Sequence, residues 1–234
     1  MSAIDFGTRS AALELMDESG LDPAELSETL GELAFINENL GGLASSLAGL
    51  ARLLPPGCAE FDVLDVGSGG GDTARGIVEW ARRRGLTARV HGIDLAPAAV
   101  ACARRANAGV PGLDFAAADL FDLPPTRKFD VVHAALLLHH LSDETAVKAL
   151  VRMRELSRQG VVINDLHRHP AAYHSIKGLS ALLSKNRLIR HDAPLSVLRG
   201  FSRRDLEGLA RRAGLAIPEI SWRWAFRWLM VART

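Results

Sequence analysis

Leu-Asp-Val-Gly-Ser-Gly-Gly-Gly-Asp, residues 64–72, is the stretch of this chain that decides its fold. The apolar run at 61–67 predicts a buried strand, and residues 72–85 predict a helix that ends at a glycine. Glycines at 67, 69 and 71 let the backbone between them turn sharply and approach a ligand without Cβ atoms in the way. A glycine-rich turn from a strand into a helix is where open α/β sheets bind their ligands.

The rest of the chain continues the alternation of strands and helices. Further strands are predicted at 88–95, 113–120, 129–134 and 160–166, with helices at 97–109, 142–157 and 201–215. Two strand-like runs, 217–224 and 227–232, close the chain, and only Ala225 and Phe226 separate them, as in a hairpin. We therefore expect an α/β fold with a parallel sheet, helices on both of its faces and a C-terminal antiparallel hairpin.

Helical segments are also predicted outside this core. Residues 10–54 carry apolar residues at helical spacing, and Pro55-Pro56-Gly57 then breaks the chain. We expect an N-terminal helical arm or lid over 1–56, and one domain over 57–234 that contains a helical lid insertion at about 168–200. The apolar stripe within that insertion fits either core packing or a lid over an apolar acceptor.

The glycine-rich loop excludes two common nucleotide-binding motifs. The dinucleotide fingerprint needs a glycine where Asp72 stands, and no Lys-Ser/Thr pair follows to make a phosphate loop. Instead, Asp65 precedes the first glycine by two residues, giving Asp-x-Gly-x-Gly-x-Gly. This pattern resembles the first motif of the class I S-adenosylmethionine-dependent methyltransferases, and the resemblance runs from about Phe61 to the end of the chain. An acidic site suits a cofactor that carries an ammonium and a sulfonium, whereas it would repel a pyrophosphate.

The resemblance implies a fold, a cofactor and a reaction. The fold is a Rossmann-like, seven-stranded, mostly parallel sheet with a C-terminal antiparallel hairpin, preceded here by the helical arm. The cofactor is S-adenosyl-L-methionine, and S-adenosyl-L-homocysteine is the product. Within the motif, Asp65, Gly67, Gly69 and Gly71 are the expected cofactor-binding residues.

Further cofactor residues are expected at the ends of the next strands. Asp94 ends the second strand, where a carboxylate accepts from both ribose hydroxyls, and Asp119 ends the third, where it accepts from the adenine amino group. The remaining expected contacts are Leu95 and Leu120 as apolar flanks, Ala134 against the methionine part and Asn37 from the arm. Each acid taken alone also fits a loop-capping role, and Asn37 equally fits a solvated helix position.

The acceptor site is expected where strands four and five end. His139 and His140 follow strand four, in a segment that resembles the acceptor-lining segment of the quinone-biosynthesis and small-molecule methyltransferases. Asp165 ends strand five, and His139, His140 and Asp165 are the expected catalytic residues, because a neutral histidine suits proton removal near pH 7. Successive residues point the same way only if the backbone turns, so one histidine being catalytic while the other holds the loop is a second possibility. Two structural histidines that satisfy local backbone groups are the alternative.

No metal is predicted at this site. Related magnesium-dependent methyltransferases place carboxylates where this chain has Leu136 and His139. Zinc is disfavoured because no carboxylate or cysteine completes a set with His133, His139 and His140.

The acceptor class rests on a second resemblance. The segment 164–168 (Asn-Asp-Leu-His-Arg) resembles a bacterial group of methyltransferases associated with polyketide or phenolic-lipid pathways. The expected activity is methyl transfer to oxygen, or to carbon, of a small hydrophobic phenolic, quinol or polyketide-like metabolite. A nucleic-acid or protein methyltransferase and a non-catalytic cofactor-binding protein are the alternatives.

Charge and composition limit the partners. The net charge is +1, so nucleic acid is disfavoured as a partner. Residues 1–50 hold nine acidic residues and one basic residue, whereas 168–234 hold 13 basic and four acidic residues. These segments are either two solvated faces or surfaces that dock on each other, within one chain or across a homodimer. We see neither a signal peptide nor an apolar run of the roughly 20 residues needed to span a membrane, and two cysteines favour a cytoplasmic location.

Overall fold

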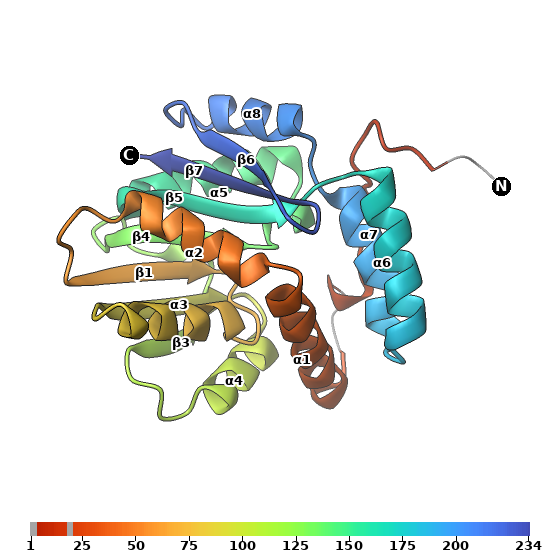
Figure 1. Ribbon diagram of the computed structural model, residues 1–234, viewed down its shortest axis with the longest axis horizontal. Helices are drawn as coiled ribbons and strands as arrows, with labels where there is room; N and C mark the ends of the chain where they lie inside the picture. The colour runs from red at the N-terminus through yellow and green to blue at the C-terminus, as the bar shows by residue number, and fades with distance from the viewer. Residues whose placement is uncertain (1–3, 18–20) are drawn as a thin grey trace.

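A single mixed sheet organises the computed structural model, which describes residues 4–17 and 21–234 (Figure 1). The strand order is β3-β2-β1-β4-β5-β7-β6. The strands are β1 (Glu60–Val66), β2 (Thr87–Asp94), β3 (Leu113–Ala117), β4 (Phe129–Ala135), β5 (Ser157–Leu166), β6 (Glu219–Arg223) and β7 (Arg227–Arg233). The first five strands pair in parallel, and β7 runs antiparallel to both β5 and β6. The predicted fold is confirmed, including the C-terminal hairpin.

The helices bury two separate apolar clusters, one on each face of the sheet. The helices are α1 (Pro23–Asn39), α2 (Gly42–Leu53), α3 (Asp72–Arg83), α4 (Pro97–Ala106), α5 (Asp143–Leu156), α6 (Pro170–Leu183), α7 (Arg187–Arg199) and α8 (Arg203–Arg212). One cluster joins α5 and α8 to the sheet, and the other joins α2, α3 and α4 to the opposite face. Three short 3₁₀ turns complete the set: η1 (Leu15–Asp17), η2 (Leu120–Asp122) and η3 (Leu138–His140).

The third strand is shorter than the sequence predicts. It ends at Ala117 rather than at residue 120, because the chain turns into η2. The side chain of Asp119 accepts a hydrogen bond from the Phe121 amide at 2.9 Å, which caps this 3₁₀ turn. The carboxylate therefore lies in a loop just beyond the strand, at the carboxyl edge of the sheet.

The N-terminal arm has two parts with different roles. Leu50 and Leu53 of α2 are fully buried against the sheet, so α2 belongs to the core. The part before α2 crosses instead to the insertion formed by α6 and α7 (Figure 1). Ser10 donates its amide to the Leu198 carbonyl at 3.0 Å.

The acidic arm docks on the basic C-terminal third within one chain. Glu25 pairs with Arg187 at 2.8 Å, and Glu14 lies 3.6 Å from Arg199. Of the two possibilities raised by the sequence, solvated faces or docking surfaces, these contacts match docking. The arm makes them within one chain, without a second subunit. None of the helices in the two described ranges combines the length and apolar character that a membrane crossing requires.

Candidate active site

A cavity of about 1160 Å³ lies at the carboxyl ends of the central strands. Its floor comes from the carboxyl ends of β1, β2, β4 and β5, from the loops after β1, β2, β3 and β4 and from the start of β7, and its roof comes from η1, α1, α6 and α7. The roof is anchored by Asp192 of α7, which accepts hydrogen bonds from the amides of Leu15 and Met16 at 2.9 and 3.0 Å. The walls are mostly apolar, and a small number of carboxylates, imidazoles and amides interrupt them.

The glycine-rich loop forms one end of this cavity. Gly67, Gly69 and Gly71 all have positive φ, at 69°, 51° and 77°. A Cβ atom on Gly67 would lie 2.9 Å from the Leu137 side chain, and one on Gly71 would lie 2.6 Å from the Phe115 ring. Glycine is therefore required at both positions by backbone conformation and by space. Gly67 and Gly69 line the cavity, whereas Gly71 lies behind them and precedes α3.

Asp65 presents one unpaired oxygen at the cavity. Its Oδ1 lies 2.7 Å from Nδ1 of His133, whose Nε2 lies 2.9 Å from the Ser46 hydroxyl. Its Oδ2 is buried and has no hydrogen-bond partner among the described residues. A buried carboxylate oxygen without a partner is costly, so the geometry suits a cationic ligand beside it. His133 is committed to this network, which removes it from the trio of histidines considered for zinc.

Two further carboxylates line the same end of the cavity. Asp94 accepts backbone hydrogen bonds from Gly69 and Ala96, each at 2.9 Å, one on each oxygen. One oxygen of Asp119 accepts a hydrogen bond within its own loop, from the Phe121 amide. Each carboxylate oxygen has two lone-pair positions, so both residues keep acceptor capacity toward the cavity. Leu95, which is 73% exposed, and the buried Leu120 line the cavity beside them.

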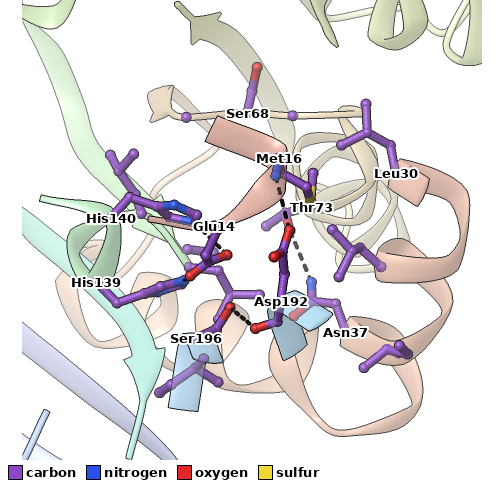
Figure 2. Close-up of a pocket in the computed structure, with 18 of the residues that line it drawn as sticks. Glu14, Met16, Leu30, Asn37, Ser68, Thr73, His139, His140, Asp192 and Ser196 are labelled. Carbon is purple, nitrogen blue, oxygen red and sulfur yellow. Dashed lines mark hydrogen bonds and ion pairs between the residues drawn. The ribbon is translucent and has the colours of Figure 1, made fainter. Parts of the chain in front are cut away.

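Two predicted cofactor residues remain: Asn37 lines the cavity, whereas Ala134 does not. Asn37 of α1 is buried at the cavity and donates to Asp72 and Thr73 at 3.3 and 3.4 Å (Figure 2). Its Oδ1 has no partner among the described residues. Ala134 lies inside β4, where neighbouring strands cover it, and the next residue, Ala135, lines the cavity instead.

A buried histidine–aspartate pair forms the opposite wall. Nδ1 of His139 lies 2.7 Å from Oδ1 of Asp165, and Oδ2 of Asp165 accepts the Leu138 amide at 2.9 Å. Burial alone would raise the pKa of Asp165, but the charge and hydrogen bond of His139 and the Leu166 amide hold that pKa below its usual range. His139 lines the cavity, whereas Asp165 lies behind it. Asp165 therefore acts on the cavity through His139.

His140 and Glu14 complete this wall. Both imidazoles turn toward Glu14, with Nε2 of His139 3.8 Å and Nε2 of His140 3.9 Å from its carboxylate (Figure 2). Nδ1 of His140 lies 3.0 Å from Asp17. Glu14 comes from the opposite end of the chain, and sequence reasoning missed it. The sequence does contain one feature that could have pointed to Glu14. It is a single acid within the apolar run 11–16, in the N-terminal arm that was expected to act as a lid.

This convergence corrects one step of the sequence analysis. The statement that no carboxylate completes a metal-ligand set is wrong, because the ligand atoms of Glu14, His139 and His140 lie within 4.8 Å of one another. A cation already sits beside them, however. Nε of Arg199 lies 3.6 Å from Glu14, and its guanidinium donates to the carbonyl oxygens of His139 and His140 at 3.0 and 2.8 Å. This positive charge opposes a divalent ion at the same carboxylate, and the absence of a metal stays a prediction.

Comparisons with known proteins show what this chain resembles in sequence and in fold. Residues 63–160 match a family model described as a methyltransferase domain, whereas no curated protein matches the sequence significantly. Human N-acetylserotonin methyltransferase, solved with S-adenosylmethionine, is similar with a TM-score of 0.64 and 19% identity over 91% of this chain and 56% of that one. An O-methyltransferase family 2 protein from Planctomyces limnophilus, solved with apigenin, has a TM-score of 0.65 and 14% identity over 93% and 63%.

A third similar structure has nearly the same length as this chain. An S-adenosylmethionine-dependent methyltransferase from Aquifex aeolicus has a TM-score of 0.61 and 17% identity, over 92% of this chain and 99% of its own. This chain spans only 56% and 63% of the length of the human and Planctomyces proteins. At these identities the structural likeness establishes the fold, and the matched segment 63–160 contains the glycine-rich loop, Asp94, Asp119 and both histidines of the wall. Residues 63–160 therefore match a methyltransferase domain, and the described part of the chain shares its fold with these methyltransferase structures.

Proposed function

We propose that this protein transfers a methyl group from S-adenosylmethionine to oxygen, or to carbon, of a small hydrophobic phenolic, quinol or polyketide-like metabolite. The observation that carries the proposal is the Asp165–His139 pair, which faces a mostly apolar cavity that also holds the glycine-rich loop. A cavity of about 1160 Å³ has room for both the cofactor and an acceptor, since single ligand pockets occupy roughly 300–1,000 Å³. The apigenin bound by the Planctomyces protein supports an aromatic acceptor.

The cofactor fits the acidic end of the cavity. In this proposal Asp94 accepts from the ribose hydroxyls and Asp119 from the adenine amino group, with Leu95 and Leu120 against the ring, and all four residues line the cavity. The unpaired Oδ2 of Asp65 suits the ammonium of the methionine part. The cofactor supplies a methyl group made electrophilic by the attached sulfonium, so the protein's own contribution is binding, alignment and proton removal.

Proton removal falls to His139 in this proposal. The Nδ1–H of His139 donates to the ionised Asp165, which fixes the tautomer and leaves Nε2 as the proton acceptor. When the acceptor oxygen receives the methyl group, Nε2 of His139 would take the proton of its hydroxyl group. Asp165 is thus a positioning residue, and His139 is the catalytic base.

The apolar roof excludes water and aligns the acceptor. Leu26, Leu30 and Leu33 of α1 line the cavity, as do Ile176 and Leu179 of α6. Of the two interpretations of the stripe in the insertion, Ile176 and Leu179 support the lid. Leu182 and Leu183, at the end of the same stripe, are 81% and 71% exposed, so they neither pack in the core nor line the cavity.

Mass spectrometry of reaction products tests the proposal. The protein is incubated with cofactor that carries an isotopically labelled methyl group and with a panel of phenols, quinols and polyketides. We expect the label in one class of acceptor, with at least about a hundredfold less transferred by His139→Ala at equal cofactor occupancy. Label recovered only in added nucleic acid or protein, or tight cofactor binding without any transfer, would contradict the proposal.

A further inference from the structure

A buried arginine in the cavity wall has two guanidinium nitrogens without a hydrogen-bond partner among the described residues. Arg227 begins β7, lines the cavity and is 3% exposed. Its Nε and Nη1 are buried and make no hydrogen bond with any residue in the described parts of the chain. Burial lowers the pKa of Arg227 to about 10, so the side chain still carries its positive charge at neutral pH. An unpaired buried cation is among the costliest groups in a protein interior, so its retention needs a reason.

The nearest negative charge does not satisfy this arginine. Asp165, on the neighbouring strand β5, attracts Arg227 electrostatically. Its oxygens already accept from Nδ1 of His139 and from the amides of Leu138, His139 and Leu166. All of its lone-pair positions are thereby taken. The attraction lowers the cost of burying the guanidinium, and its hydrogen-bonding capacity stays unused.

The cavity wall around the start of β7 is largely aromatic. Trp222, Trp224 and Phe226 line the cavity next to it. The turn that presents them is strained, because Ala225 and Phe226 have φ of 60° and 56°. His167 stays neutral, since burial and the nearby charges of His169 and Arg168 lower its pKa to about 4. A flat apolar wall therefore ends in one available positive charge.

The strand order places Arg227 on the acceptor side of the cavity. The strands β4 and β5 separate β7 from β1, which carries the glycine-rich loop. Three inter-strand steps of about 4.8 Å place β7 about 14 Å from β1. The cofactor is addressed by Asp65 and Asp94 on β1 and β2, so the guanidinium faces the acceptor beyond the reacting methyl group.

We propose that Arg227 binds a carboxylate of the acceptor, so that the substrate is an aromatic hydroxy acid rather than a neutral phenol. The inference rests on the proposed function and narrows it to one chemical class. A carboxylate offers the planar pair of oxygens that a guanidinium binds with two parallel hydrogen bonds. Its aromatic body would pack against Trp222, Trp224 and Phe226, while the wall formed by His139 faces the hydroxyl to be methylated.

Binding of a matched pair of probes tests the inference. The full-length protein is saturated with S-adenosylhomocysteine, and 2-naphthoate or the neutral 2-naphthamide is titrated while tryptophan fluorescence is followed. We expect the wild type to bind the acid at least tenfold more tightly than the amide, and Arg227→Met to lose this preference. Arg227→Lys should keep part of it. Arg223→Met is the matched control, because Arg223 pairs with Arg227 across the hairpin but does not line the cavity.

Stability separates a ligand-binding role from a structural one. If Arg227 serves the acceptor, Arg227→Met removes an unpaired buried cation, so Tm and affinity for S-adenosylhomocysteine should be unchanged or higher. A lower Tm together with weaker cofactor binding would assign Arg227 to the fold and overturn the inference. So would equal binding of acid and amide by the wild type, including no binding of either. If the protein prefers the acid but methylates no acceptor, the carboxylate site at Arg227 is supported and the proposed methyl transfer is contradicted.

Discussion

Asp94 ties the glycine-rich loop to the cofactor end of the cavity, through its hydrogen bond from the Gly69 amide. We predict that Asp94→Ala lowers the affinity for S-adenosylmethionine at least tenfold, since each hydrogen bond to a charged group contributes about 1.5–3 kcal/mol. Calorimetry measures the affinity, and circular dichroism checks the fold. Asp122→Ala is the control, because Asp122 is exposed and does not line the cavity. Equal affinities for the Asp94 variant and the wild type would remove Asp94 from the site.

The two adjacent histidines differ in their partners, and this difference predicts different kinetics. His139 is held by a buried aspartate, whereas His140 pairs with the half-exposed Asp17. We predict that His139→Ala lowers turnover per folded molecule by about 10²–10⁴, the usual range for general acid–base assistance, and that His140→Ala lowers it less than tenfold. Cofactor affinity should change little in either variant.

Loss of His139 also leaves Asp165 buried without its main partner, so Tm should fall in that variant. Turnover must therefore be normalised to folded protein. A His139 variant with reduced Tm but wild-type turnover per folded molecule would make the histidine structural and would remove the proposed base.

At the scale of elements, the contact between η1 and η3 depends on pH. Burial opposes protonation of His140, but the Asp17 hydrogen bond and the charges of Glu14, Asp17 and Asp165 outweigh it and raise the pKa of His140 above 6.5. In turn, burial would raise the pKa of Asp17, but its bond to His140 lowers that pKa below 3.8. Both groups are therefore charged between pH 3.8 and pH 6.5, and the ion pair between His140 and Asp17 is fully formed in this range.

The sign of the pH effect follows from the raised pKa of His140. Stabilisation by its protonated form is complete below pH 6.5 and is lost as the pH rises through the raised value. We predict that the free energy of unfolding of the wild type relative to His140→Gln falls from pH 6 to pH 9, with faster hydrogen exchange at residues 13–17. Denaturant titrations and exchange across this range measure both quantities. A difference that is constant with pH would show that the pair does not hold η1 in place.

Elements with a local signal were predictable, whereas those made by distant contacts were not. The glycine-rich loop, the five parallel strands and the hairpin follow from short-range patterns in the chain, and so do Asp94 and Asp119 at the strand ends. Glu14 and Arg227 escaped prediction because their roles depend on burial and on residues distant in the sequence. Glu14 meets His139, which lies 125 residues away, and Arg227 lies near Asp165, which lies 62 residues away. The β3 boundary failed because a side-chain cap, rather than hydrophobicity, ends that strand.

At the scale of the whole molecule, we predict that activity needs no metal ion. The buried cation Arg199 already compensates Glu14, so a divalent ion between Glu14 and the two histidines would add unbalanced positive charge. Dialysis against EDTA should leave turnover unchanged, and added magnesium or zinc should not raise it. Activity that EDTA abolishes and one divalent ion restores would reverse this prediction and give Glu14, His139 and His140 the role of ligands. A homodimer stays a separate prediction, which light scattering of the purified protein decides.

The order in which the ribosome makes this chain differs from the order in which the cavity is built. Arg9 donates to the carbonyl oxygen of Arg199, 190 residues away, and Arg168 donates to the carbonyl oxygens of Phe6 and Gly7. Residues 6–9 must therefore wait, without these partners, until residues 168–199 have emerged. The strand that carries the glycine-rich loop meets β2 and β4 much sooner. During synthesis, the half of the cavity that holds the glycine-rich loop can form first, and the roof closes later.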